Sequence, residues 1–376
     1  MRVSGSSSGE TSTFEEAAGC RNHFSRVTLA IVWSGWDDLE VPLFKFFKCN
    51  LSMSARRQCR PLCWISRPQS LEIDASESAL LRCLMPKAQK SRLRVGVHTS
   101  IAGALENATR RAGEIGCDTF QMFSANPRGW RTIDPTPQQC ERFREDREAR
   151  RLSPLVIHDN YLINLAAADP EIRKKSISAF QSELRRALAL GADYLVTHPG
   201  SSKGFSVSQA IAACIESLKE AASGLTLNGL MVLIENTAGQ GCAIGRSFEE
   251  VAELVSGAGR ELPVGACIDT AHSFASGYPI HTAAGLPGMI KALEKTVGLT
   301  NVRVIHANDS KAAFDSHVDR HQHIGEGQIG AEAFGRIVCH PKLHGIPFIC
   351  ETPIDEPDDD RRNLAMMRQL AGEAEG

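Results

Sequence analysis

The chain lacks a long apolar run, a recognisable secretion signal and any marked excess of charge of one sign. Its 376 residues carry a formal charge of −2. This excludes a uniformly basic surface, so any binding to nucleic acid must be local or depend on bound cations. No apolar run is long enough to cross a bilayer. The twelve cysteines are scattered, as is typical of reduced thiols. We therefore expect a cytoplasmic protein without membrane contact.

Residues 1–92 differ from the rest of the chain. They begin with a Ser/Gly-rich stretch, show no sustained periodicity and contain five of the twelve cysteines. Met85 starts a short basic segment directly before the first convincing strand. We interpret residues 1–92 as an N-terminal extension that is disordered or not natively translated, and residues 93–376 as the folded domain.

From Val95 onward, short apolar runs rich in β-branched residues alternate with segments of helical spacing. Residues 102–116 and 176–191 have such spacing, and each ends on a glycine suited to a helix C-cap. Eight strand–helix units in about 280 residues predict an α/β fold, a (β/α)8 TIM barrel. A doubly wound open sheet is the alternative, but no Gly-rich phosphate-binding motif follows the first run. The eight runs cover 95–100, 119–124, 155–160, 194–200, 232–237, 264–270, 302–309 and 348–352.

Potential metal ligands stand at the ends of six consecutive runs. A lone histidine at a strand end is usually structural, and a lone carboxylate often caps the next helix. Recurrence at six strand ends favours one shared site instead, because the carboxyl ends of barrel strands meet at one mouth. The segment VDRHQHIGEG, residues 318–327, adds two more. The nine residues are His158, His198, Glu235, Asp269, His272, His306, Asp319, His321 and Glu351.

Five imidazoles and four carboxylates are too many ligands for one ion. They suit two or three divalent ions that share a bridging carboxylate. The nitrogen-rich set favours zinc, and manganese or iron is also compatible. Clustered divalent ions are typical of enzymes that act on phosphoryl groups.

The ordered motifs resemble those of endonuclease IV, the metal-dependent apurinic/apyrimidinic endonuclease family. The resemblance runs from Val95 to the C-terminus and does not include residues 1–92. It implies three zinc ions per chain in a (β/α)8 barrel. The enzyme would cut double-stranded DNA on the 5′ side of an abasic site and leave a 3′-hydroxyl. The motifs are IHDNYLINL, HPGS, IENTAGQG, CIDTAHSFASGY, HANDSK, VDRH followed by IGEG, and ICET.

The resemblance also distributes the nine ligands among three ions. Glu235 would bridge the first and second ions and position the attacking hydroxide, and we expect Glu235 and Glu351 to be the catalytic carboxylates. The first ion would be held by His158, His198 and Glu235, the second by Glu235, Asp269, His306 and Glu351, and the third by His272, Asp319 and His321.

Two further segments are expected to contact DNA. SANPRGWR, residues 124–131, carries Arg128 and Trp130, and the next predicted loop carries Tyr161 and Leu162. In the resembled family the matching arginine, tyrosine and leucine fill or prop the gap in the base stack. For Trp130 a structural role is equally consistent with the sequence: the ring could anchor its loop on the rim of the barrel instead of contacting DNA. We expect a monomeric enzyme.

Two other classes of function remain open from the sequence. A xylose-isomerase-like sugar isomerase or epimerase with one or two metal ions would also place ligands at the last four strand ends. It would not need the other five. A DNA-damage binding protein without activity is the non-catalytic alternative, although the complete ligand set argues against it.

A chain that starts at Met85 is expected to keep its full metal complement and to cut abasic DNA as well as the full chain. The eight predicted strands close on themselves and need nothing from the preceding residues. Metal content and incision rate of the two chains check this, and limited proteolysis of the full chain should leave a fragment that begins near residue 90. Aggregation or metal loss in the shorter chain would contradict the boundary.

Overall fold

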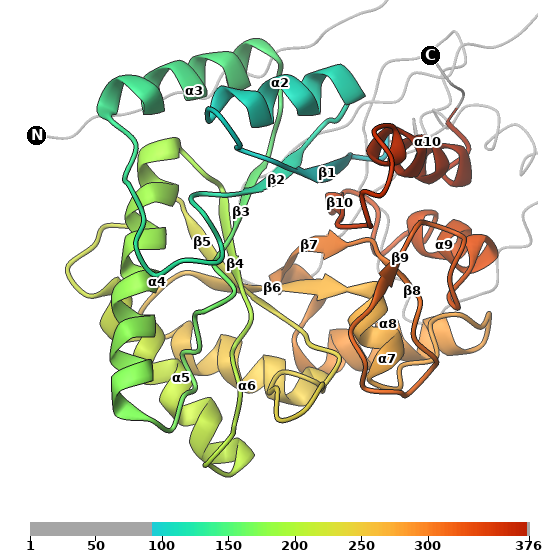
Figure 1. Cartoon of the computed structure of the whole chain (residues 1–376). Helices are drawn as coiled ribbons and strands as arrows, with labels where there is room; N and C mark the ends of the chain where they lie inside the picture. The colour runs from blue at the N-terminus through green and yellow to red at the C-terminus, as the bar shows by residue number, and fades with distance from the viewer. Residues whose placement is uncertain (1–91, 374–376) are drawn as a thin grey trace, which may run out of the picture. The chain divides into compact units, whose positions relative to one another are not determined.

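The computed structural model describes residues 92–373, so the predicted extension, apart from Arg92, lies outside the described residues. Eight parallel strands close into a barrel, which confirms the predicted fold (Figure 1). The first strand closes the barrel by pairing with the last, with Val95 opposite Phe348. In barrel order the strands are β1 (Val95–Thr99), β10 (Phe348–Cys350), β7 (Val302–His306), β6 (Val264–Asp269), β5 (Met231–Glu235), β4 (Tyr194–Thr197), β3 (Leu155–His158) and β2 (Phe120–Phe123).

Helices follow the strands and cover the outside of the barrel (Figure 1). Among residues 92–373, no helix combines the length and the apolar character needed to cross a bilayer. The seven cysteines in this range are free thiols, as predicted. The helices are α2 (Glu106–Ile115), α3 (Pro137–Ala149), α4 (Pro170–Leu190), α5 (Val207–Ala222), α6 (Phe248–Ala258), α7 (Thr270–Ala275), α8 (Gly285–Thr296), α9 (Ala331–Val338) and α10 (Asp359–Leu370), with a 3-10 turn at Leu299–Asn301.

The two helices predicted from spacing form and end on their glycines. Gly116 closes α2 and Gly191 closes α4, each in the left-handed conformation that glycine adopts without strain. Helix α4 begins earlier than its apolar spacing suggests, at Pro170. The carboxylate of Asp169 accepts hydrogen bonds from the second and third main-chain amides, and Pro170 loses no hydrogen bond in the first turn.

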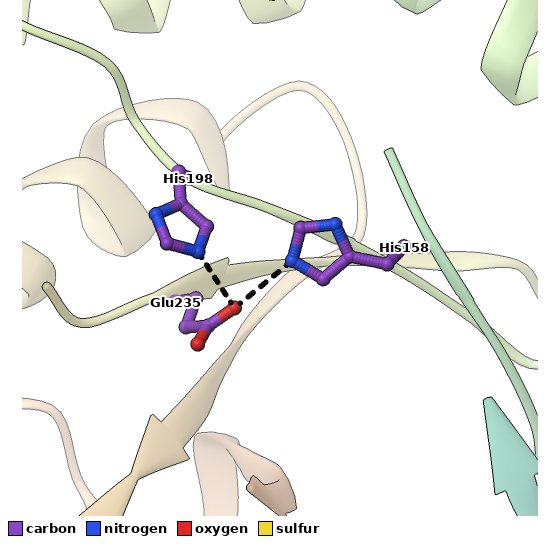
Figure 2. Close-up of side chains that lie close together, drawn as sticks. All are labelled: His158, His198 and Glu235. Atoms are coloured by element: carbon purple, nitrogen blue, oxygen red, sulfur yellow. Dashed lines mark hydrogen bonds and ion pairs between the residues drawn. The ribbon is translucent and has the colours of Figure 1, made fainter. Parts of the chain in front are cut away.

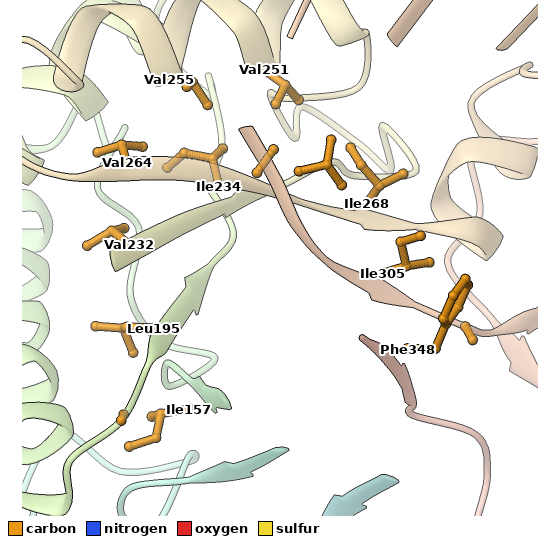
Figure 3. Close-up of a cluster of buried hydrophobic side chains, with 14 of the residues drawn as sticks. Ile157, Leu195, Val232, Ile234, Val251, Val255, Val264, Ile268, Ile305 and Phe348 are labelled. Carbon is orange, nitrogen blue, oxygen red and sulfur yellow. The ribbon is translucent and has the colours of Figure 1, made fainter. Parts of the chain in front are cut away.

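The buried residues form two layers because side chains alternate along each strand. One layer faces the helices, where Ile234 of β5 and Val264 of β6 lie near Val251 and Val255 of α6 (Figure 3). The other layer fills the barrel interior, and each of its members stands two positions before a predicted ligand. The ligands therefore point into the barrel axis, one step above this layer. The interior residues are Val156, Val196, Leu233, Cys267, Val304 and Ile349.

A small antiparallel sheet lies between β7 and α9. Strand β8 (Asp309–Ser310) pairs with β9 (His321–Gln322), so Ser310 lies opposite His321. This pairing returns the long segment after β7 to the barrel mouth. It places residues 318–327, called the metal loop here because they carry Asp319 and His321, beside the ends of β6 and β7.

Candidate metal centre

The strand ends surround a cavity of about 760 Å³ at the barrel mouth. Asp269 and His306 are fully buried beneath it. The other seven predicted ligands line the cavity: His158, His198, Glu235, His272, Asp319, His321 and Glu351.

Glu235 lies at the centre of the ligand set, with no exposed surface. Its Oε2 atom is 3.2 Å from Nε2 of His158 and 3.2 Å from Nε2 of His198 (Figure 2). Its Oε1 atom is 3.0 Å from Nδ1 of His306 and 3.3 Å from Nδ1 of His272. One carboxylate thus faces four imidazoles, two on each oxygen, as a bridging ligand would.

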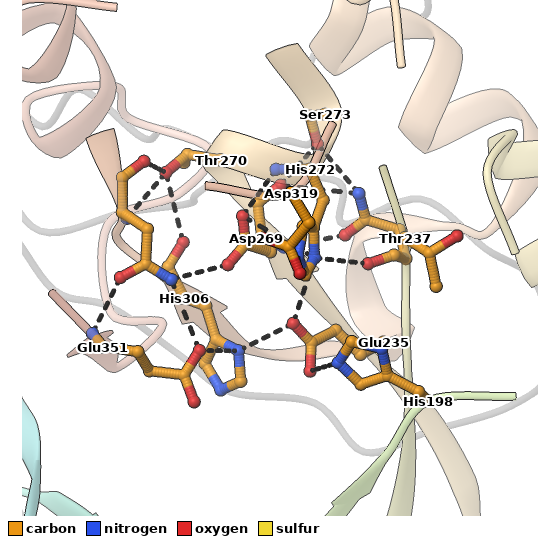
Figure 4. Close-up of polar contacts among 12 residues, drawn as sticks. His198, Glu235, Thr237, Asp269, Thr270, His272, Ser273, His306, Asp319 and Glu351 are labelled. Atoms are coloured by element: carbon orange, nitrogen blue, oxygen red, sulfur yellow. Dashed lines mark hydrogen bonds and ion pairs between the residues drawn. The ribbon is translucent and has the colours of Figure 1, made fainter. Parts of the chain in front are cut away.

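A second group joins Glu235 to three strand-end residues on β6, β7 and β10 (Figure 4). Nδ1 of His306 lies 3.1 Å from Oε2 of Glu351. One ligand atom from each of the four residues lies within 4.8 Å of every other, close enough to share one ion. The group consists of Glu235, Asp269, His306 and Glu351.

A third group lies where the metal loop meets α7. Asp319 places one carboxylate oxygen 3.3 Å from Nε2 of His272 and the other 3.3 Å from Nε2 of His321. Asp269 also adjoins this group, because its Oδ2 atom is 3.7 Å from Nε2 of His321. The third group therefore touches the second through Asp269, just as Glu235 links the second to the first.

The imidazoles are oriented as metal ligands require. A ligating histidine normally directs its other ring nitrogen to a protein oxygen. Nε2 of His321 is buried and makes no hydrogen bond among residues 92–373, although carboxylate oxygens of Asp319 and Asp269 lie 3.3 and 3.7 Å away, so this atom can serve as a metal ligand. Three rings have their Nδ1 atom beside a main-chain oxygen: His158 at 2.9 Å from Asp159, His272 at 2.9 Å from Asn236, and His321 at 3.1 Å from Glu351.

The pKa shifts indicate that the site stabilises positive charge. Burial alone would raise the pKa of Glu235, but the imidazoles of His306 and His198 hold it well below its ordinary value. Burial also opposes ionisation of Asp319, yet the hydrogen bond from His272 lowers its pKa to about 2. Burial would lower the pKa of His158, and its hydrogen bond to Glu235 instead raises it to about 9. Divalent cations can supply this positive charge in place of protons, so the donor set fits metal ions.

Two buried amides escaped the sequence prediction. Gln121 of β2 accepts from Nε2 of His306 at 2.8 Å and donates to Oε1 of Glu351 at 2.5 Å, which leaves Nδ1 of His306 facing the carboxylates of Glu235 and Glu351. Asn308 donates to Oδ2 of Asp269 at 2.6 Å and to Oε2 of Glu351 at 3.3 Å. Each amide fixes two ligands. For Gln121 the only signal in the sequence was a polar residue at an inward-facing position of β2, and for Asn308 it was the motif HANDSK, which does not say which side chains the amide meets.

The glycines of the metal loop are explained by a buried carboxylate. Asp309 is fully buried, and a Cβ atom on Gly327 would lie 2.4 Å from its Oδ1 atom. Gly325 has a φ of 84°, in the left-handed region that favours glycine. The loop wraps around the carboxylate, which accepts the main-chain N–H groups of Ser310, Gly325, Gly327, Ile329 and Gly330.

The four residues expected to contact DNA lie on two adjoining loops. Arg128 is exposed in the loop after β2, where Trp130 is 43% exposed. Tyr161 is 64% exposed after β3, and Leu162 beside it is half-buried. The two loops touch, because the main-chain N–H of Tyr161 donates to the oxygen of Pro127 at 3.1 Å. Tyr161 also lines the cavity that holds the ligands.

Comparison with known proteins agrees with this geometry. The family model of xylose isomerase-like TIM barrels matches residues 109–370. A protein of Solibacter usitatus named "Probable endonuclease 4" is 54% identical over 282 residues, covering 74% of this chain and 97% of the relative. A protein of the same name from Methanoculleus marisnigri is 41% identical, covering 74% and 99%.

Solved structures lead to the same family. The crystal structure of endonuclease IV from Thermus thermophilus is 37% identical with a TM-score of 0.67, and the match covers 75% of this chain and all of that one. A D-tagatose 3-epimerase-like protein has a TM-score of 0.57 at 18% identity, which shows the barrel fold alone. The chain therefore belongs to the endonuclease IV family of the xylose isomerase-like TIM barrels.

Proposed function

We propose that the chain is a DNA repair endonuclease that hydrolyses the phosphodiester bond on the 5′ side of an abasic site in duplex DNA. Water would add to phosphorus as the bond to the 3′ oxygen breaks, leaving a 3′-hydroxyl and a 5′-deoxyribose phosphate. The observation that carries the proposal is a set of eight nitrogen and oxygen ligands in three linked groups, with Asp319 between His272 and His321 as the ninth, in a barrel of the endonuclease IV family.

The ligand groups fit three zinc ions, with manganese or iron also compatible with the donors. Divalent ions at such close spacing lower the pKa of water and neutralise charge on the attacked and departing oxygens. His158, His198 and Glu235 would hold the first ion. The second would bind Glu235, Asp269, His306 and Glu351, and the third His272, Asp319 and His321, with Asp269 beside both.

The chain's own groups would hold the substrate around these ions. Glu235 is fixed by burial and by four imidazoles, so it can hold its position as the phosphorus centre changes geometry. Tyr161 offers a flat, exposed ring at the edge of the metal cavity and Trp130 offers another on the adjoining loop, where bases or the gap left by a missing base could be covered. Arg128, on the same loop as Trp130, supplies a positive charge that could contact DNA phosphates.

The test is incubation of the protein with duplex DNA that carries one synthetic abasic site. We expect incision without added magnesium, products with a 3′-hydroxyl, and a metal content near three ions per chain. A sugar isomerase would instead hold one or two ions and interconvert sugars. Sugar isomerisation without incision by the zinc-loaded protein would refute the proposal.

Arg128→Ala is expected to weaken binding to abasic duplex by roughly tenfold and to leave the metal content unchanged, because the residue lies outside all three ligand groups. Fluorescence anisotropy with labelled duplex and metal analysis measure the two quantities. Arg142→Ala removes the same charge from the outer helix α3 and serves as the control. If Arg128→Ala binds and cuts like the parent, its loop is structural.

A further inference from the structure

A buried arginine joins both ends of the loop that carries Arg128 and Trp130. Arg186 of α4 is only 2% exposed. Its Nε atom donates to the hydroxyl of Ser124, the first residue after β2, at 2.7 Å. Its Nη1 atom donates to Thr132 at 2.9 Å and to Asp134 at 3.1 Å, near the start of α3. One guanidinium thus connects the two ends of the loop formed by residues 124–134.

The guanidinium is itself held in place. Its Nη2 atom lies 2.8 Å from Oε1 of Glu183, one turn earlier on α4, and Glu183 is also 2% exposed. The hydroxyl of Ser124 donates to the other oxygen of Glu183. An arginine with a planar fork of donors can satisfy all these acceptors at once, which a lysine cannot.

The middle of the same loop is tied to the second DNA-facing loop by Asn160. The side chain of Asn160 is buried and donates from Nδ2 to the oxygen of Gly129 at 2.9 Å. Its Oδ1 atom accepts the main-chain N–H of Leu162 at 2.8 Å. Asn160 therefore couples the residues next to Arg128 with those next to Tyr161, and makes one body of the two loops.

Packing of the loop against the rest of the protein is only partial. Trp130 is the largest side chain of the first loop, yet it is 43% exposed. It lines a cavity of about 200 Å³ that Asn160, Glu183 and Arg186 also line. A ring that is partly exposed to solvent makes fewer van der Waals contacts than a buried one and so restrains its loop less. The buried polar contacts of Arg186 and Asn160 add restraints on the loop that this partial packing does not supply.

We propose that Arg186 and Asn160 are positioning residues that hold residues 124–134 and 160–162 in the DNA-binding conformation before DNA arrives. Neither residue needs to touch DNA or metal. The inference rests on the proposed function and adds the element that organises the DNA-facing loops. If the bound conformation becomes only a fraction of the free population, the apparent affinity falls by that fraction.

The test compares Arg186→Met with Arg185→Met in the full-length protein. Arg185 is the adjacent, exposed arginine of α4, so its loss matches the change in charge without touching the loop. For Arg186→Met we expect amides of residues 125–133 to exchange hydrogen about tenfold faster and the KM for abasic duplex to rise about tenfold. The kcat and the metal content should stay within about twofold of the parent. Arg185→Met should change none of these.

A second variant separates loop positioning from folding. Arg186→Met leaves Glu183 buried without its cation, which can unfold the protein. Thr132→Val combined with Asp134→Ala removes two loop contacts and spares the Arg186–Glu183 pair, and it should also speed exchange and raise KM. Unchanged exchange and KM in this double variant would overturn the proposal. Hydrogen exchange needs no DNA, so it remains informative even if the parent protein fails to cut abasic duplex.

Discussion

Glu235→Gln is expected to remove almost all incision activity and to reduce the metal content, while the barrel stays folded. Loss of a partner outside the metal's own ligands already costs about 10- to 100-fold in affinity or activity. Loss of the bridging charge itself should cost on the order of 10³-fold or more in rate. Glutamine has the same size, so the cause would be chemical rather than a change in packing.

The geometry explains the size of this effect. The amide nitrogen of a glutamine would turn two hydrogen-bond donors toward ring nitrogens that now face a carboxylate oxygen at 3.0 to 3.3 Å. Glu235 has almost no exposed surface, so its charge acts on the four imidazoles with little screening by solvent. Both the first and the second ligand group include this residue. Metal binding at both positions should therefore weaken together.

Metal analysis after dialysis and single-turnover incision measure these outcomes, with circular dichroism as the check on folding. Glu249→Gln is the matched control, since Glu249 is exposed at the start of α6 and belongs to none of the ligand groups. A folded Glu235→Gln protein that keeps its ions and cuts at a near-normal rate would show that the residue is not a bridging ligand.

The barrel could be predicted because its sequence signal is local and repeated. Each strand is a short apolar run, and six of the eight runs end on a histidine or a carboxylate. The period of two along a strand places His158 above Val156 and Glu235 above Leu233, so the ligand at the end of a run faces the same interior as the apolar residue before it. The closed order of strands then gathers the ends at one mouth.

The partners of the ligands could not be predicted in the same way. Gln121 touches His306 and Glu351, which are 185 and 230 residues away. Contacts of that kind depend on the register between strands that are not neighbours in sequence. Asn308 lies in a conspicuous motif, but the sequence does not say which carboxylates its amide meets. The contacts of Arg186 with the loop after β2 could not be predicted either. Arginines are common on exposed helix faces, and nothing in the sequence marks this one as buried.

The structure also adds a link between the ligand groups that the sequence does not indicate. The resemblance divided the nine residues into three separate sets joined only by Glu235. In the structure, Asp269 stands between the second and third groups, with Oδ1 accepting the main-chain N–H of His272 at 2.7 Å and Oδ2 3.7 Å from His321. The loop that carries His321 therefore lies against the end of β6, and the buried carboxylate of Asp309 accepts main-chain hydrogen bonds from residues that follow His321 in the chain.

Asp309→Asn is expected to lower the free energy of unfolding by roughly 4 kcal/mol, because at least two main-chain N–H groups would face an amide N–H in place of a carboxylate oxygen. For a domain of this size the melting temperature should fall on the order of 10 °C. Since β8 pairs Ser310 with His321, the third ligand group should also lose its geometry, and the metal content should fall by about one ion.

Thermal melts in chelator separate the stability effect from metal loss, and metal analysis without chelator measures the loss of metal. Asp315→Asn is the control, because its side chain is 61% exposed in the same segment. If Asp309→Asn melts and binds metal like the parent, the carboxylate does not organise the loop.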